Sequence, residues 1–211
     1  LFPYTTLFRS IVYIATDSYH SLLGISINSI VMNQKNGKEM NFYICSPDLT
    51  DEHKVQLINL VADCGGSIHF INVSDYAERI NFQFNTSGFH SIVLARLFLA
   101  SYLPKHIEKI LYLDCDVVAN GDIWELEKIN LQNKDFGAVP ELCMPKKQKA
   151  EIGLGEEDTY FNCGVMLINL AYWREKRISE QFLKYFVEKN GKLLYNDQDI
   201  LNNCCKGEIK K

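Results

Sequence analysis

The stretch ILYLDCDVV, residues 110–118, decides the fold class of this 211-residue chain. Its apolar start is a continuous hydrophobic run, as a parallel strand covered on both faces requires. The run stops at Asp114 and Asp116. Side chains two apart on extended backbone point the same way, so both carboxylates would face one side at the carboxyl end of the strand. Open α/β sheets bind ligands at that end, which makes this pair the first candidate site.

The segments before this stretch alternate between strand and helix patterns. Short β-rich runs occur at 11–15 (IVYIA), 41–45 (NFYIC) and 67–71 (SIHFI). Apolar residues at helical spacing separate these runs, and the second helix, which starts at Thr50, carries Val55, Ile58 and Val61. A β-α-β-α-β order implies parallel strands joined by crossover helices. The pattern predicts one α/β domain with a mixed, mostly parallel sheet flanked by helices.

Later segments extend the same architecture. The run SIVLARLFLAS predicts an apolar helix over 91–101 with Arg96 as its single charge. Two further strands are expected at 136–139 and 165–169. A long amphipathic helix is predicted over 172–190, and a short final helix begins at Asn196-Asp197 and continues through Cys204.

Composition excludes several classes of function. The formal net charge is −4, so a nucleic-acid partner, which needs a basic face, is not expected. No apolar run reaches the roughly 18–20 residues that span a bilayer. The seven cysteines include no C-x-x-C pair, which argues against a zinc ribbon and favours a reducing, cytoplasmic setting. Residues 1–10 (LFPYTTLFRS) are interpreted as a non-native extension, so the domain is taken as 11–211.

Four other groups are candidate ligand contacts, and each has a structural alternative. Asp17 could accept a base N–H or a ribose hydroxyl, or could cap the next helix. Tyr19 could stack on a flat base, or could belong to the core. Arg96 needs a partner, either a nearby carboxylate or a phosphate or sugar. The 197–199 segment (DQD) could read sugar hydroxyls, or could complement the helix dipole.

The acidic pair at 114 and 116 favours a metal. Two hard oxygen donors suit Mn²⁺, with Mg²⁺ as the alternative, and a diphosphate would supply further oxygens. Such a metal neutralises charge developing on a leaving phosphate. The alternative is a pair of solvated acids at a turn after the strand.

Taken together, these motifs resemble glycosyltransferase family 8, the retaining enzymes that include bacterial lipopolysaccharide galactosyltransferases and glycogenin. The resemblance rests on segments in the family's order, at 11–20 (IVYIATDSYH), 95–104 (ARLFLASYLP), 110–118 (ILYLDCDVV), 160–174 (YFNCGVMLINLAYWR) and 195–202 (YNDQDILN). It implies the GT-A fold, a Rossmann-like sheet with a D-x-D metal site.

The resemblance also implies roles for individual residues. The uridine would contact Ala15, Thr16, Asp17 and Tyr19, with Cys115 near the ribose. Mn²⁺ would be held by Asp114 and Asp116. The donor sugar or its phosphate would contact Arg96, Glu141, Asn162, Asp197 and Gln198. Glu141 stands where close relatives carry an Asp. The catalytic candidates on the donor's reactive face are Gln198, as an electrostatic and positioning group, and Asp199.

The implied reaction moves galactose or glucose from a UDP-hexose to a hydroxyl of a saccharide or glycolipid acceptor, in cell-surface polysaccharide or lipopolysaccharide synthesis. The family's pattern continues to a His that completes the metal site and a Lys that binds the pyrophosphate, whereas this chain ends at GEIKK. A chain truncated there is expected to be a weak catalyst. The absent part is also the expected site of any peripheral contact with the inner face of the membrane.

Two other interpretations remain open from the sequence. A phosphatase of the haloacid dehalogenase type also places D-x-D after an apolar strand, with its first Asp as the nucleophile. That motif usually opens the fold, whereas Asp114 lies mid-chain. A fragment that binds nucleotide sugars without catalysis is the second alternative.

Overall fold

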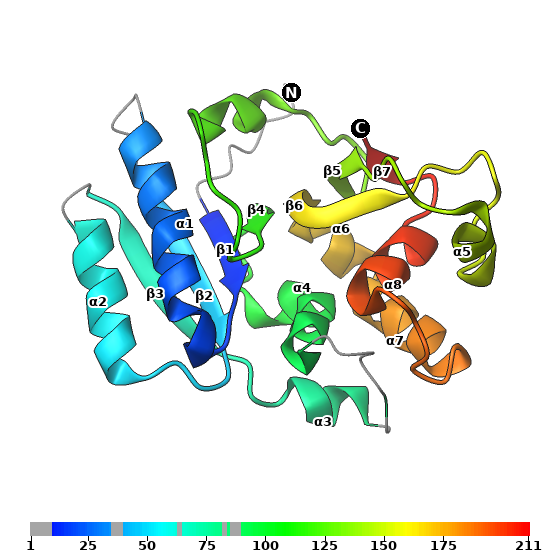
Figure 1. Ribbon diagram of the computed structural model, residues 1–211, viewed down its shortest axis with the longest axis horizontal. Helices are drawn as coiled ribbons and strands as arrows, with labels where there is room; N and C mark the ends of the chain where they lie inside the picture. Colours follow the sequence, from blue (N-terminus) through cyan, green and yellow to red (C-terminus); the bar gives the residue numbers. More distant parts are fainter. Residues whose placement is uncertain (1–9, 35–39, 63–64, 82–83, 85–89) are drawn as a thin grey trace.

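The computed structural model describes residues 10–34, 40–62, 65–81, 84 and 90–211. Within these ranges seven strands form one sheet in the order β3-β2-β1-β4-β6-β5-β7 (Figure 1). The strands are β1 (Ser10–Ile14), β2 (Asn41–Ser46), β3 (Ser67–Asn72), β4 (Lys109–Leu113), β5 (Phe136–Pro140), β6 (Phe161–Asn169) and β7 (Ile209–Lys210).

Parallel pairing dominates the sheet. The pairs β1–β2, β2–β3, β1–β4 and β5–β7 are parallel, and β6 runs antiparallel between β4 and β5. This confirms the predicted mixed, mostly parallel sheet. The α-helices are α1 (His20–Asn33), α2 (Asp51–Ala62), α3 (Tyr76–Ile80), α4 (Leu99–Tyr102), α5 (Lys146–Glu151), α6 (Leu170–Glu175), α7 (Ile178–Glu188) and α8 (Asn196–Cys204). The 3₁₀ helices are η1 (Asp17–Tyr19), η2 (Ser91–Phe98) and η3 (Ile123–Lys128).

Hydrophobic cores lie on both faces of the sheet, because strand side chains alternate between the faces. One core joins Val12 of β1 to residues of η2, α4, α6, α7 and α8. The other joins Ile11 of β1 to residues of α1, α2 and η3. The two helical layers are visible on either side of the strands in Figure 1. Both faces are therefore covered, as the apolar run in β4 predicts. Within the described ranges, no helix is long and apolar enough to cross a membrane.

The predicted helix over 172–190 is wrong, because it is two helices, α6 and α7. Arg177 breaks the run with a left-handed backbone (φ 50°). Trp173 and Phe182 explain the break. Nine residues apart, they would lie on roughly opposite faces of one straight helix. The turn lets both bury completely and meet edge to face at 5.5 Å between ring centroids.

Other expectations need smaller corrections. The helix predicted over 91–101 is the 3₁₀ helix η2 followed by α4. In α2 the buried residues are Leu57 and Val61, whereas Val55 and Ile58 are exposed, because the helix turns its Leu57 face to the sheet.

Differences at the ends of strands are also small. β6 begins four residues before the predicted 165, and the short strand β7 lies in a segment for which no strand was expected. Ser10, placed in the 1–10 extension, already belongs to β1 and pairs with Asn41. Residues 1–9 lie outside the described residues.

Candidate active site

Three strand ends meet at one edge of the sheet. β1 and β4 are adjacent and parallel, so the residues that follow them, Ala15 and Asp114, emerge side by side. β6 is antiparallel to β4, so its first residues lie beside the end of β4, where the Asp114 N–H donates to the Gly164 carbonyl at 2.8 Å. Since β1 has β2 on one side and β4 on the other, this edge is also where the strand order reverses, the usual ligand position in open α/β sheets.

A cavity of about 380 Å³ opens at this edge. Its lining includes nine of the residues predicted from the sequence, namely Ala15, Thr16, Tyr19, Arg96, Asp114, Cys115, Asp116, Asp197 and Gln198. Its other lining residues are Ile14, His90, Ile92, Val93, Tyr112 and Tyr195. Four predicted residues do not line it, namely Asp17, Glu141, Asn162 and Asp199. The structure thus brings most of the predicted site together.

Arg96 lies at the centre of the polar contacts. Tyr112 and Asp114 are two residues apart, so their side chains point to the same face of the sheet, which η2 covers. Arg96 reaches both of them from η2. Its Nη2 donates to the Tyr112 hydroxyl and to Asp114 Oδ1, both at 2.7 Å. Its Nη1 donates to the Cys163 carbonyl at 2.8 Å and lies 3.0 Å from Asp197 Oδ2. One guanidinium therefore joins the first acid of the D-x-D to the first acid of the 197–199 segment.

The charges around Arg96 are mutually dependent. Burial works against its charge, but Asp197, Tyr112 and Asp114 outweigh that cost and hold its pKa well above the ordinary value. Burial also raises the pKa of Asp197 to about 6, although Arg96 opposes the rise. Among the described residues, the buried Arg96 Nε has no hydrogen-bond partner, and the buried Asp197 Oδ2 has the ion pair with Arg96 Nη1 but no hydrogen bond. Buried polar atoms normally have partners, so this pair marks a place for a polar ligand.

Gln198 and Asp199 occupy different positions. Gln198 lines the cavity, where its Oε1 accepts from the Cys163 N–H at 2.9 Å and its Nε2 donates to the Tyr160 hydroxyl at 3.2 Å. Asp199 is fully buried and accepts from the Tyr160 hydroxyl at 2.7 Å and the Tyr195 N–H at 2.9 Å. Burial raises the pKa of Asp199. This placement favours a positioning role for Asp199 over direct contact with a substrate.

Asp17 is committed to the neighbouring helix. Its Oδ1 accepts from the Thr50 N–H at 2.8 Å and lies 2.7 Å from His53 Nδ1, and these contacts, the Thr50 N–H first, lower its pKa to about 2. Asp48 in turn accepts from the Asp17 N–H at 3.0 Å. The carboxylate thus joins the start of α2 to η1, which neither alternative from the sequence anticipated. Its assignment to the nucleotide stays a prediction.

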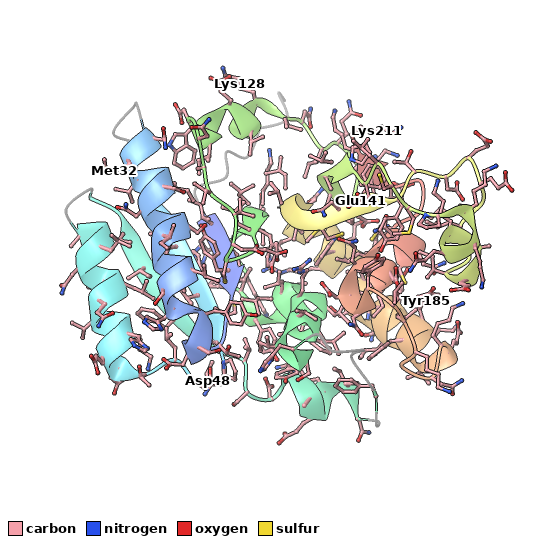
Figure 2. All side chains as sticks on the ribbon, in the orientation of Figure 1. Met32, Asp48, Lys128, Glu141, Tyr185 and Lys211 are labelled. Carbon is pink, nitrogen blue, oxygen red and sulfur yellow. The ribbon has the colours of Figure 1, made fainter. Side chains whose placement is uncertain are left out.

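Glu141 and Asn162 form an outer pair beside β6, where Figure 2 labels Glu141. Asn162 Nδ2 donates to Glu141 Oε2 at 3.4 Å, and Asn162 Oδ1 accepts from the Gly164 N–H at 2.9 Å. A Cβ on Gly164 would lie 3.0 Å from Asp114 Oδ2 and 3.2 Å from Asn162 Oδ1. Glycine at 164 therefore leaves the space that the Asp114 carboxylate occupies.

Sequence reasoning missed three contributors to the site. Tyr112 holds both Arg96 and Asp114, and the signal for it was its position two residues before Asp114 on the same strand face. Tyr160 and Gly164 act through contacts between β6, β4 and α8. No local pattern reveals such contacts.

The fold and the position of the acidic pair define a class of protein, the GT-A glycosyltransferases. The sequence profile of glycosyl transferase family 8 matches residues 10–211, and the chain belongs to this family. The structure of the galactosyltransferase LgtC in complex with donor and acceptor sugar analogs has a TM-score of 0.86 to this chain. The two are 29% identical, over 95% of this chain and 72% of that one.

Three curated relatives come from bacteria. A protein of Haemophilus influenzae described as a glycosyltransferase is 33% identical over 95% of this chain and 60% of its own length. The lipopolysaccharide 1,2-glucosyltransferase of Escherichia coli K12 is 28% identical over 94% of this chain and 58% of its own length. The lipopolysaccharide 1,3-galactosyltransferase of Salmonella typhimurium is 26% identical over 85% of this chain and 54% of its own length. The chain thus spans less than two thirds of the length of each of these three relatives.

The family match overturns the phosphatase alternative. The place of Asp114 agrees with this outcome. It follows the fourth strand along the chain, whereas the D-x-D of such a phosphatase usually opens the fold.

Proposed function

We propose that this chain is the donor-binding part of a retaining hexosyltransferase. It transfers galactose or glucose from a UDP-sugar to a hydroxyl of a saccharide or glycolipid, in lipopolysaccharide or cell-surface polysaccharide synthesis. The observation that carries the proposal is the Arg96 bridge between Asp114 and Asp197 in the wall of one cavity. In a nucleotide sugar, the diphosphate can be held near carboxylates only through a cation, and the hexose hydroxyls can donate to a carboxylate, so the two acids and the guanidinium suit both parts. The glucosyl- and galactosyltransferase activities of the relatives support the hexose.

The nucleotide end is assigned to the β1 side of the cavity. Ala15, Thr16 and Tyr19 line it directly after β1, and Tyr19 is exposed enough to stack on a base. Cys115 closes the floor between β1 and β4, where its Sγ lies 3.4 Å from the Ile14 carbonyl. Burial holds the pKa of the Cys115 thiol high, so it acts as a neutral contact surface beside the ribose.

The metal is assigned to Asp114 and Asp116, and the donor set fits Mn²⁺ or Mg²⁺. Both acids line the cavity, and the Asp116 carboxylate has no hydrogen bond or ion pair among the described residues. Gly164 leaves space at Asp114 Oδ2. No group of three metal-binding side chains occurs in the described part of the chain, so a metal here would depend on phosphate oxygens as further ligands. When bound, it would supply positive charge beside the diphosphate.

The sugar end is assigned to the α8 side. Asp197 Oδ2 is buried, and among the described residues it has only the ion pair with Arg96 and no hydrogen bond, so it would accept from a sugar hydroxyl. In the reaction the bond between the anomeric carbon and the diphosphate oxygen breaks, the acceptor oxygen forms a bond on the same face, and the acceptor proton passes to the leaving diphosphate oxygen. Positive charge grows on the sugar ring as this happens. The Gln198 Oε1 dipole would stabilise that charge without becoming bonded to it.

The reaction is placed in the cytoplasm, near the inner face of the membrane where lipid-linked acceptors are made. The six described cysteines are free thiols, which supports a reducing compartment. The acceptor is a saccharide or glycolipid, as the relatives' names suggest.

The test of the proposal is UDP release from UDP-galactose and UDP-glucose with and without Mn²⁺. Asp116→Asn should remove the Mn²⁺-dependent release and Mn²⁺-dependent UDP binding, because it deletes a metal ligand that supports no contact of the fold. Glu125→Gln is the control, since it makes the same charge change at an exposed residue of η3. Unchanged Mn²⁺-dependent UDP binding in Asp116→Asn would contradict the metal assignment. If UDP is released from neither UDP-galactose nor UDP-glucose, the proposed transferase activity is contradicted.

A second variant tests whether the space beside Gly164 lets the Asp114 carboxylate bind the metal. Gly164→Ala should weaken Mn²⁺ binding to the UDP complex by roughly tenfold, because its Cβ pushes on Oδ2 while Arg96 and Tyr112 hold Oδ1. Titration of Mn²⁺ followed by electron paramagnetic resonance measures the affinity. Gly121→Ala is the control, since a Cβ there meets nothing within 4 Å. Equal Mn²⁺ affinity in wild type and Gly164→Ala would show that the carboxylate has room to move.

A further inference from the structure

Tyr160 is buried beside the cavity but does not line it. The residue precedes β6, and only 1% of it is exposed. Its hydroxyl donates to Asp199 Oδ1 at 2.7 Å and accepts from Gln198 Nε2 at 3.2 Å. A phenol has a single proton to donate. Because that proton goes to Asp199, the side of the hydroxyl that faces Gln198 can only accept.

Gln198 is held from its other side as well. The Cys163 N–H donates to Gln198 Oε1 at 2.9 Å. A reversed amide would set Nε2 against this N–H and Oε1 against the lone pairs of Tyr160, so that two donors and two acceptors would face each other. The orientation of the amide is therefore fixed twice, by a backbone donor and by a phenol that cannot donate to it.

The chain of contacts also carries charge. Asp199 accepts the Tyr195 N–H at 2.9 Å with its other oxygen, and burial followed by the Asp199 charge raises the pKa of Tyr160 well above its ordinary range. Tyr160 thus keeps its proton and transmits the negative field of Asp199 to the NH₂ end of Gln198. Hydrogen bonds in series polarise one another in a buried site. The field drives electron density in the amide toward Oε1.

We propose that Tyr160, with Asp199 behind it, is a positioning residue that sets the amide orientation of Gln198 and makes Oε1 more negative. The inference rests on the proposed function and deepens it, since a neutral oxygen enriched in electron density stabilises a positive sugar ring without bonding to it. It also gives Asp199 a role that its complete burial permits. Asn202 of α8 ties this helix to the residue that follows Tyr160, because it bonds the N–H and the carbonyl of Phe161 at 2.7 and 2.9 Å.

The first test needs no turnover. In a ¹⁵N-labelled chain, the side-chain NH₂ resonance of Gln198 is assigned by its loss in Gln198→Ala. Tyr160→Phe should shift this resonance and speed its exchange with water, because Nε2 loses its acceptor. Tyr13→Phe is the matched control, since it removes another fully buried hydroxyl, which bonds Ser26 at 2.9 Å on the other face of the sheet. An unchanged Gln198 resonance in Tyr160→Phe overturns the inference.

The second test measures UDP release from the UDP-hexose that the wild-type chain uses. Tyr160→Phe should lower the rate by about tenfold to a hundredfold, with UDP affinity unchanged, while Tyr13→Phe stays near the wild-type rate. The double variant with Gln198→Ala should be no slower than Gln198→Ala alone, because Tyr160 acts only through that amide. If the rate losses of the two single variants add in full in the double variant, Tyr160→Phe has a general structural effect and the inference is overturned. A wild-type chain that releases no UDP contradicts the proposed function instead, whatever the amide resonance shows.

Discussion

Replacing Arg96 with Met is expected to abolish hexose transfer and to lower the free energy of unfolding by about 3–5 kcal/mol at pH 7. The variant keeps most of the side-chain volume but removes the cation between two carboxylates. Asp114 Oδ1 and Asp197 Oδ2, which lie 2.7 and 3.0 Å from the guanidinium, would then repel each other, and the buried Asp197 would lose its cation. The Cys163 carbonyl would also lose its donor. Urea unfolding and UDP release measure the two effects.

The pH dependence of this loss separates charge from packing. The pKa of Asp197 is already raised to about 6, and Arg96 opposes that rise, so its removal raises the pKa further. The folded variant then binds a proton that the unfolded chain, with an ordinary Asp, does not bind until about pH 4. The stability of Arg96→Met should therefore recover as the pH falls from 7 to 5. A deficit that stays constant over this range would mean that lost packing, and not unpaired charge, is the cause.

Arg96→Lys completes the comparison. It retains the charge but has no planar fork, so it cannot bond both acids and the Tyr112 hydroxyl at once. Stability should recover in part, while transfer stays low because the bridge between the two acids is lost. Full recovery of both properties would show that a point charge is sufficient at position 96.

The sequence predicts the sheet well, for a physical reason. Buried parallel strands need uninterrupted apolar runs, and 11–15, 42–45 and 110–113 show them plainly. What it cannot predict depends on distant packing. The division at Arg177 follows from Trp173 meeting Phe182, and neither side chain signals the break by itself. The short strand β7 exists because β5 offers an edge at Phe136 and Gly137, a feature of the assembled sheet.

The candidate site shows the same contrast between residues that the sequence marks and residues whose role depends on distant contacts. Asp114, Asp116 and Asp197 could be predicted because their residue types and their places after a strand or at the start of a helix point to ligand chemistry. Asp17 has an equally suggestive place after β1, yet its carboxylate bonds Thr50, just before α2, and His53 in α2, both more than thirty residues further on. Tyr160 shows the converse, since nothing around it in the sequence marks it. Its importance lies wholly in contacts with α8 that only the fold creates.

Gln198→Ala is expected to slow transfer by about a hundredfold to a thousandfold while UDP affinity stays within about twofold of wild type. Gln198 sits on the α8 side of the cavity, and its contacts are to Cys163 and Tyr160, away from the β1 side assigned to the nucleotide. Its loss removes a dipole aimed where positive charge grows, which matters in the transition state and little in the ground state. Single-turnover transfer and calorimetric titration of UDP measure the two quantities.

The cost to folding must be separated from the cost to catalysis. Gln198→Ala leaves the Cys163 N–H without its acceptor, which should destabilise the fold by about 1–3 kcal/mol. Asn202→Ala is the matched control, because it removes two bonds to Phe161 and one to the Gln198 carbonyl but leaves the Gln198 amide in place. It should cost at least as much stability and slow transfer far less. If both variants lose the same rate for the same stability, Gln198 is a structural residue and the sugar end of the site lies elsewhere.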